Sequence, residues 1–171
     1  MADIPADKGN DMTRPLALLL VSMAFAVPAG SNQSPAFVPP IVKPPPERLS
    51  LYEAATWGTI VPASLLRAVA IAESGEADWA IGDWGWSRGR YQTHERWREE
   101  RVALLGREYD PHDPVDSSEL TVLILSQNYA RFGSMPLALS AYNAGPGWVE
   151  KHGLRRDYLR KINIALRKVG V

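Results

Sequence analysis

The placement of proline is the sequence feature that most constrains how this chain can fold. Nine of its fourteen prolines lie within the first 46 of 171 residues. Because proline removes a backbone donor and interrupts helices and central strands, residues 30–47 are predicted to form an extended, proline-rich linker. The folded domain is therefore expected over residues 48–171, which is long enough to build one hydrophobic core without disulfides.

The segment before this linker has the features of an export signal. Arg14 precedes an uncharged apolar run from Leu16 to Val27, and small residues follow the run. This run is shorter than the roughly 20 residues that span a bilayer comfortably. We therefore predict a signal peptide over residues 1–29, with an uncleaved anchor as the alternative. The domain is then expected in the periplasm or outside the cell, with no integral membrane segment once the signal is removed.

The hydrophobic period of the remaining chain predicts a mostly α domain. Apolar residues recur at helical spacing, and glycine or proline separates the helical segments. The expected helices span residues 49–57, 63–74, 94–107, 116–132, 136–142 and 158–169. The fourth should be capped by Asp116 and bury Leu120, Leu123, Ile124 and Phe132. The glycine-rich segment near residues 75–92 is predicted to be irregular or a small β-hairpin, and residues 145–147 are predicted to form a turn.

The composition excludes several classes of function. The chain has no cysteine, which rules out disulfides, thiolate metal sites and a cysteine nucleophile. Nineteen basic and nineteen acidic residues cancel, so no overall positive field favours nucleic acid. The three histidines lack the spacing of a metal site. We expect no metal, no cofactor, no nucleic-acid partner and a monomer.

Glu73 is the residue most strongly indicated for chemistry. It lies four residues after Val69 and eight after Leu65, so its carboxylate should share the buried stripe of the helix. Burial and the negative end of the helix dipole both raise a carboxyl pKa, as a general acid near neutral pH requires. The alternative is a helix-end glutamate that points into solvent. The aromatic residues between positions 79 and 91 are expected to form the walls of a sugar cleft.

Several motifs occur in a recognisable order along the chain. Glu73-Ser74 is followed by Gly-Arg-Tyr-Gln at residues 89–92, by Ala-Tyr-Asn-Ala-Gly-Pro-Gly at residues 141–147 and by Tyr158. Together they resemble the lytic transglycosylase domain of the lysozyme superfamily, over roughly residues 49–171. The resemblance implies a lysozyme-like fold and cleavage of the glycan strands of peptidoglycan. One departure is Arg-Tyr at positions 90 and 91, where the family has Leu-Met.

A second resemblance concerns the segment between Glu73 and these motifs. Residues 82–89 are similar to the Gly-Asp-x-Gly-x-Ser-x-Gly segment of goose-type and invertebrate-type lysozymes, in which the aspartate is associated with hydrolysis. The two resemblances imply catalytic roles for Glu73 and Asp83. Substrate-binding roles are implied for seven residues: Ser74, Ser87, Tyr91, Gln92, Tyr142, Asn143 and Tyr158. Each also has a purely structural alternative, such as a turn aspartate, a buried polar group or a core aromatic.

Two mechanisms are open for one acid acting on the bond between N-acetylmuramic acid and N-acetylglucosamine. Glu73 would protonate the glycosidic oxygen and then act as a base. If it accepts a proton from the sugar's own C6 hydroxyl, the product is a 1,6-anhydro end. If Asp83 positions a water instead, the outcome is hydrolysis. In a third reading, of a different class, the domain binds glycan or assists envelope assembly without catalysis.

Overall fold

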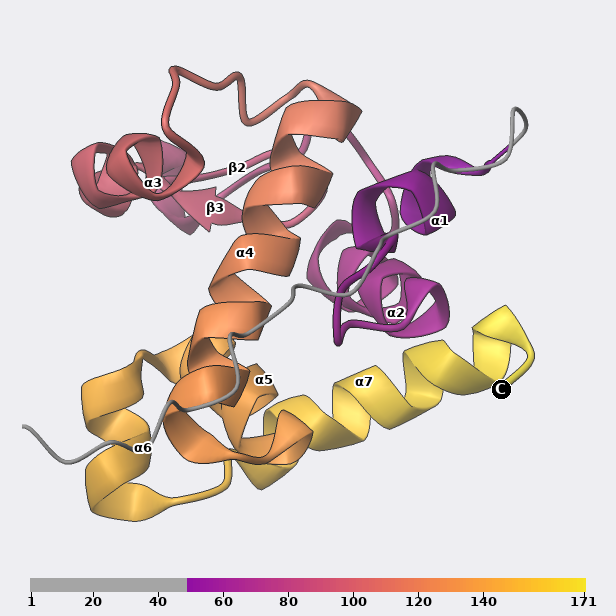
Figure 1. Ribbon diagram of the computed structural model, residues 1–171, viewed down its shortest axis with the longest axis vertical. Coiled ribbons are helices and arrows are strands. Elements are labelled where there is room, and N and C mark those ends of the chain that lie inside the picture. The colour runs from indigo at the N-terminus through magenta and orange to yellow at the C-terminus, as the bar shows by residue number, and fades with distance from the viewer. Residues whose placement is uncertain (1–48) are drawn as a thin grey trace, which may run out of the picture. The chain divides into compact units, whose positions relative to one another are not determined.

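The computed structural model describes residues 49–171, and its elements are connected mainly by short turns (Figure 1). The predicted signal peptide and linker lie outside the described residues. The helices are α1 (Leu51–Thr56), α2 (Ala63–Ser74), α3 (Arg98–Leu105), α4 (Pro114–Phe132), α5 (Met135–Ala144), α6 (Pro146–His152) and α7 (Arg156–Val169). Of two short 3-10 helices, η1 (Asp83–Gly85) lies between the first two strands, and η2 (Glu95–Trp97) follows the third. The predicted mostly α class is confirmed.

A small antiparallel sheet forms where the glycine-rich segment was predicted to be a hairpin or irregular. Its strands β1 (Ile81–Gly82), β2 (Ser87–Arg88) and β3 (Thr93–His94) pair in sequence order. Ile81 pairs with Arg88, and Ser87 pairs with His94. The third strand lies just beyond the predicted range, so the helix expected from His94 begins only at Arg98. A strand and η2 occupy its first residues.

The core lies between α2, α4, α5 and α7. Helix α4 packs against α5 and α1, and α2 packs along α7 (Figure 1). The apolar side chains buried in this core include Leu65, Leu66, Val69, Leu125, Leu139 and Ile162. Among the described residues, no helix is both long and apolar enough to cross a membrane.

Three further local expectations were wrong. Asp113, and not Asp116, caps α4: its carboxylate accepts from the backbone N–H groups of Val115 and Asp116 at 2.8 and 2.9 Å. The cap moves there because Pro114 suits the first helical position, which lacks a partner for a backbone N–H in any case. Asp116 instead forms an ion pair with Arg107 at 2.7 Å.

The other two wrong expectations concern the buried face of α4 and the turn after α5. The stripe that α4 buries includes Leu120, Val122 and Leu125, while Leu123, Ile124 and Phe132 are only half-buried. The expected turn at residues 145–147 begins α6. Proline is accepted in its first turn.

Candidate active site

Glu73 lies at the end of α2, where the helix is about to stop. Gly75 caps this end with φ +69°, a left-handed conformation that glycine adopts at little cost. The Glu73 side chain is half-buried, and its Oε1 accepts a hydrogen bond of 2.7 Å from the Tyr158 hydroxyl of α7. The first helix of the core and the last helix of the chain thus meet at this carboxyl.

The surroundings of Glu73 favour its protonated form, which can donate a proton. Burial raises the pKa of Glu73. The hydrogen bond from Tyr158 and the positive charge of Lys161 act in the opposite direction, and the negative charge of Asp83 acts with burial. The net effect is a raised pKa, which keeps a larger fraction of this carboxyl protonated than in a solvated glutamate.

Two tyrosines border this carboxyl from different helices. Tyr158 is 3% exposed, and burial raises the pKa of its hydroxyl well above the usual value. Tyr142 of α5 donates from its hydroxyl to the backbone carbonyl of Tyr91 at 2.8 Å. Its pKa is also raised, first by burial and then by the charge of Glu73. Both hydroxyls therefore remain neutral donors at any ordinary pH.

Residues 89–92 are held against the end of α2 by hydrogen bonds. The Ser74 hydroxyl donates to the carbonyl of Arg90 at 2.7 Å and accepts from the backbone N–H of Ala77. The Gln92 amide donates to the carbonyl of Gly89 at 2.9 Å. Gly89 itself has φ +73°, and an added Cβ would lie 1.7 Å from the carbonyl oxygen of Pro111. Ser74 and Gln92 therefore already have local partners that shape this segment.

Tyr91 does not fit the expectation that it contacts substrate. Its side chain is fully buried, and its hydroxyl hydrogen-bonds with that of Ser118 of α4 at 2.9 Å. The ring therefore packs in the core, where it supports the segment from behind. Asn143, the neighbour of Tyr142, is by contrast exposed at the end of α5.

Asp83 is positioned by the sheet. It is exposed, has φ +47°, and accepts a hydrogen bond from the hydroxyl of Ser87, which is buried in β2. Its negative charge contributes to raising the pKa of Glu73, so the two carboxyls belong to one electrostatic site. Ser87 thus contacts Asp83 directly and orients its carboxylate.

Two features of the site were not anticipated. Lys161 follows Tyr158 by three residues, one helical turn, and this spacing could have indicated that it faces the same carboxyl. Arg90 donates to Asp78 through two nitrogens, at 2.7 and 3.1 Å, and to the Tyr52 hydroxyl of α1 at 2.7 Å. Tyr52 also donates to Glu76. These hydrogen bonds connect α1 with Asp78 and Glu76 before β1 and with Arg90 after β2. No motif in the sequence predicts them.

The described residues contain no group of three histidine, aspartate or glutamate side chains arranged to hold a metal ion. What the site offers is one carboxyl of raised pKa, two neutral phenols, a nearby lysine and a second carboxylate. This set is suited to general acid–base chemistry.

The model of the transglycosylase SLT domain matches residues 50–164 of the chain. The chain belongs to the transglycosylase SLT family. Its structure resembles the 70-kDa soluble lytic transglycosylase of Escherichia coli, with 24% identity and a TM-score of 0.53 over 70% of this chain and 20% of that one. A complex of the 70-kDa soluble lytic transglycosylase with bulgecin A matches at 23% identity and a TM-score of 0.53, with the same coverage.

An inactive variant of the lytic transglycosylase Slt of Pseudomonas aeruginosa, in which a glutamate is replaced by glutamine, matches at 22% identity and a TM-score of 0.54. The match covers 70% of this chain and 21% of the Pseudomonas chain. These likenesses show the lysozyme-like fold, and the chain spans about a fifth of the length of each solved relative. No curated protein matches the chain significantly.

Proposed function

We propose that this SLT domain cleaves the glycan strands of peptidoglycan at the bond between N-acetylmuramic acid and N-acetylglucosamine. The observation that carries the proposal is Glu73, a half-buried carboxyl of raised pKa at the position where the family motif begins. The solved Pseudomonas relative, inactivated by replacing one glutamate with glutamine, supports a glutamate as the essential group. The substrate class also supports action in the periplasm or outside the cell, consistent with the predicted signal peptide.

Glu73 acts first as an acid. Because Tyr158 donates to Oε1, the transferable proton belongs on Oε2. Transfer of that proton to the glycosidic oxygen allows the bond from this oxygen to C1 to break, and the muramic ring develops positive charge at C1. The carboxylate that remains is stabilised by Tyr158 and by the charge of Lys161.

Glu73 then acts as a base. It accepts the proton of the C6 hydroxyl as O6 of the same sugar bonds to C1, which closes a 1,6-anhydro ring and returns Glu73 to its protonated form. No water is consumed, so no second carboxylate is required. Because one carboxyl completes both steps, Glu73 serves as the single general acid and base.

Glu73→Gln should abolish cleavage of purified peptidoglycan, because the amide keeps the shape of the side chain and cannot donate an acidic proton. The variant should not be less stable at neutral pH. Burial raises the folded-state pKa, so the wild type loses stability as pH rises through that pKa, whereas glutamine does not titrate. Lysis at the wild-type rate by this variant would refute the assignment. Glycan binding by a wild-type protein that never cleaves would favour the non-catalytic reading.

Hydrolysis is the second candidate, and the position of Asp83 is the observation that favours it. Its carboxylate is anchored by Ser87 and acts electrostatically on Glu73, as expected of a group that positions water beside an acid. Asp83→Asn separates the two mechanisms. For the transglycosylase we expect little loss of rate, and for a hydrolase a loss of about 10²–10⁴-fold. Mass spectrometry of the new sugar ends checks the result, because anhydro ends lack the water that hydrolysis adds.

A further inference from the structure

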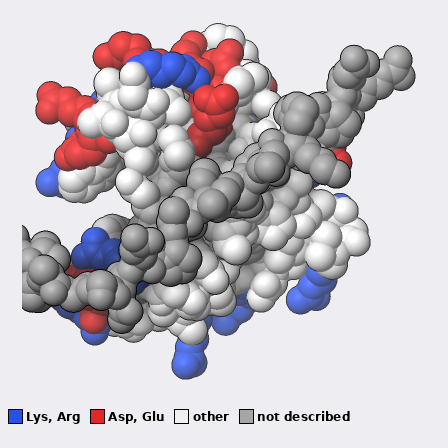
Figure 2. Space-filling view, viewed as in Figure 1, with Lys and Arg blue, Asp and Glu red and all other residues white. Residues whose placement is uncertain are grey.

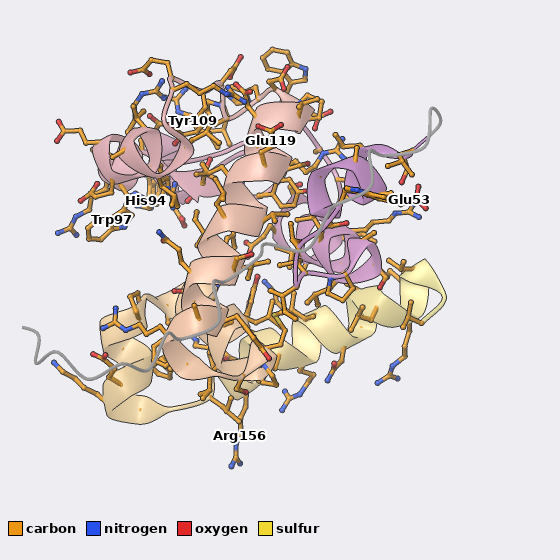
Figure 3. All side chains as sticks on the ribbon, viewed as in Figure 1. Glu53, His94, Trp97, Tyr109, Glu119 and Arg156 are labelled. Carbon is orange, nitrogen blue, oxygen red and sulfur yellow. The ribbon has the colours of Figure 1, made fainter. Side chains whose placement is uncertain are left out.

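Two ring side chains stack at one edge of the lobe formed by the sheet and α3, and a third follows them three residues on in η2. Trp86 is 55% exposed, and Trp97 of η2 is 47% exposed. Trp86 stacks on His94 of β3, with ring centroids 5.8 Å apart and planes 13° from parallel. Figure 3 shows His94 and Trp97 at the lower edge of this lobe, directed away from α3. We call Trp86, His94 and Trp97 the aromatic platform.

Strand pairing places His94 of the platform on the same face of the sheet as Ser87, the hydrogen-bond partner of Asp83. His94 is the register partner of Ser87, and directly paired residues of antiparallel strands project from one face. The Ser87 hydroxyl on that face donates to Asp83, whose charge acts on Glu73. His94 and the Trp86 ring stacked on it are therefore neighbours of the candidate active site.

A second, independent connection runs through α3. Arg101 donates to the carbonyl of His94 at 3.0 Å. Its positive charge also acts on the Tyr142 hydroxyl, where it partly offsets the rise in pKa caused by burial and by Glu73. The strand that carries His94 thus lies close to Tyr142 as well as to Asp83. Figure 2 shows a recess between the lobe of α3 and the lobe of α5 and α6, and Figure 3 places His94 and Trp97 at the edge of the α3 lobe on that side.

Backbone contacts hold the platform in place and orient its one polar ring. The N–H of Glu95 donates to the carbonyl of Trp86 at 2.7 Å. The N–H of Arg96 donates to Nδ1 of His94 at 3.1 Å. In the neutral imidazole the proton must then be on Nε2, which makes this nitrogen a donor. The platform combines flat apolar rings with a hydrogen-bond donor at their edge.

We propose that the aromatic platform binds one N-acetylated sugar ring of the glycan strand, on the Asp83 side of the bond that Glu73 cleaves. A pyranose presents an apolar face of C–H groups, which stacks on indole, and a rim of hydroxyl and acetamido groups, which accepts from His94. This inference rests on the proposed function for the identity of the ligand. It assigns the platform to the substrate strand itself, and not to a protein partner.

The chain provides a matched control outside the platform. Trp79 is 77% exposed and stacks on His112, with centroids 4.9 Å apart and planes 19° from parallel. His112 lies in the segment before α4, and its Nδ1 pairs with the carbonyl of Asp78. Trp79, although one of the aromatic residues predicted to line a cleft, thus forms with His112 another stacked indole–imidazole pair, to which the connections of the platform with Asp83 and Tyr142 do not extend. The two pairs differ in their imidazole, because His112 donates from Nδ1 to a carbonyl.

Binding is measured by calorimetry with a soluble tetrasaccharide of alternating N-acetylglucosamine and N-acetylmuramic acid, in proteins that all carry Glu73→Gln so that nothing is cleaved. Adding Trp86→Ala or Trp97→Ala should weaken binding about 3- to 10-fold, the range expected for losing one ring contact. Trp86→Tyr should restore most of it, and Trp79→Ala should bind as the parent does. In otherwise wild-type enzyme, Trp86→Ala should raise KM and leave kcat nearly unchanged.

Unchanged affinity in both alanine variants would overturn the platform, as would an equal loss for Trp79→Ala. Two variants are used so that misfolding of one leaves the other decisive. The result is separable from the proposed function. If the parent binds the tetrasaccharide through the platform and the wild type cleaves nothing, the function fails and the platform stands. If the wild type cleaves and the platform variants bind normally, the platform fails and the function stands.

Discussion

At the scale of single residues, the site depends on the carboxyl of Glu73, whose pKa is raised by some neighbours and lowered by others. Burial and the charge of Asp83 hold the Glu73 pKa up, while Tyr158 and Lys161 draw it down. The acid must be protonated to donate and ionised to accept, so influences of opposite sign on its pKa serve both steps. Tyr158 contributes to this balance and also fixes the orientation of the carboxyl.

Tyr158→Phe should therefore change both the pH profile and the rate. Losing the hydrogen bond that lowers the Glu73 pKa raises that pKa, so the alkaline fall in kcat should move to higher pH. The unpositioned carboxyl should also reduce kcat about 10-fold, the value of one hydrogen bond of roughly 1.4 kcal/mol. Rates measured across pH check this. Tyr109→Phe is the matched control, because this buried tyrosine has a hydroxyl without a hydrogen-bond partner among the described residues. An alkaline fall in kcat that stays in place or moves to lower pH would contradict the role of Tyr158.

At the scale of elements, side-chain caps fix the starts of α1 and α4. Ser50 and Glu53 form a reciprocal capping box at the start of α1. Asp113 with Pro114 starts α4, and Gly133 ends it in a left-handed conformation at φ +64°. These boundaries position the ends of α4, which packs against α5 and so supports Tyr142.

Asp113→Ala should destabilise the domain by about 1 kcal/mol, because two backbone N–H groups of α4 lose their acceptor. This corresponds to a drop of roughly 3–5 °C in Tm. Asp113→Asn keeps an acceptor of equal capping strength and should melt within about 1 °C of the wild type. Thermal unfolding followed by circular dichroism distinguishes the two variants, and an equal loss in both would show that the charge matters rather than the cap.

At the scale of the whole molecule, a net charge of zero conceals an uneven distribution. Asp and Glu gather over the lobe of α3, whereas Lys and Arg project from the opposite edge (Figure 2). Arg156 at this edge belongs to α7 (Figure 3), which also exposes Arg160, Lys161, Arg167 and Lys168. Among the described residues, the hydrophobic core cluster runs from Val61 to Ile162.

A chain that starts at Arg48 should therefore fold like the full-length protein. We expect the same Tm within about 2 °C and unchanged activity on soluble glycan fragments, because a proline-rich linker is not expected to contribute to a core. Calorimetry of both chains side by side tests this. A large loss of helicity in the shorter chain would show that residues before Arg48 contribute to the packing.

The sequence by itself determined the class of the domain and indicated Glu73 as its candidate acid. Helical periodicity interrupted by glycine and proline is a local property, and so is the spacing that places Glu73 on a buried stripe; both predictions could be made without tertiary contacts. Capping was less accessible, because Asp113 and Asp116 are chemically equal candidates, and Pro114 decides between them only once the start of the helix is known.

Tertiary structure decided what surrounds the acid. Tyr158 is 85 residues away from Glu73, and its bond exists only because α7 packs along α2. Tyr91 could have lined a cleft, but the packing of α4 buries its ring beside Ser118. The pKa of Glu73, the ties of Arg90 and the arrangement of the aromatic platform likewise depend on distances between segments remote in sequence. Residue identity and spacing do not encode such distances, since they result from how the helices and the sheet pack together.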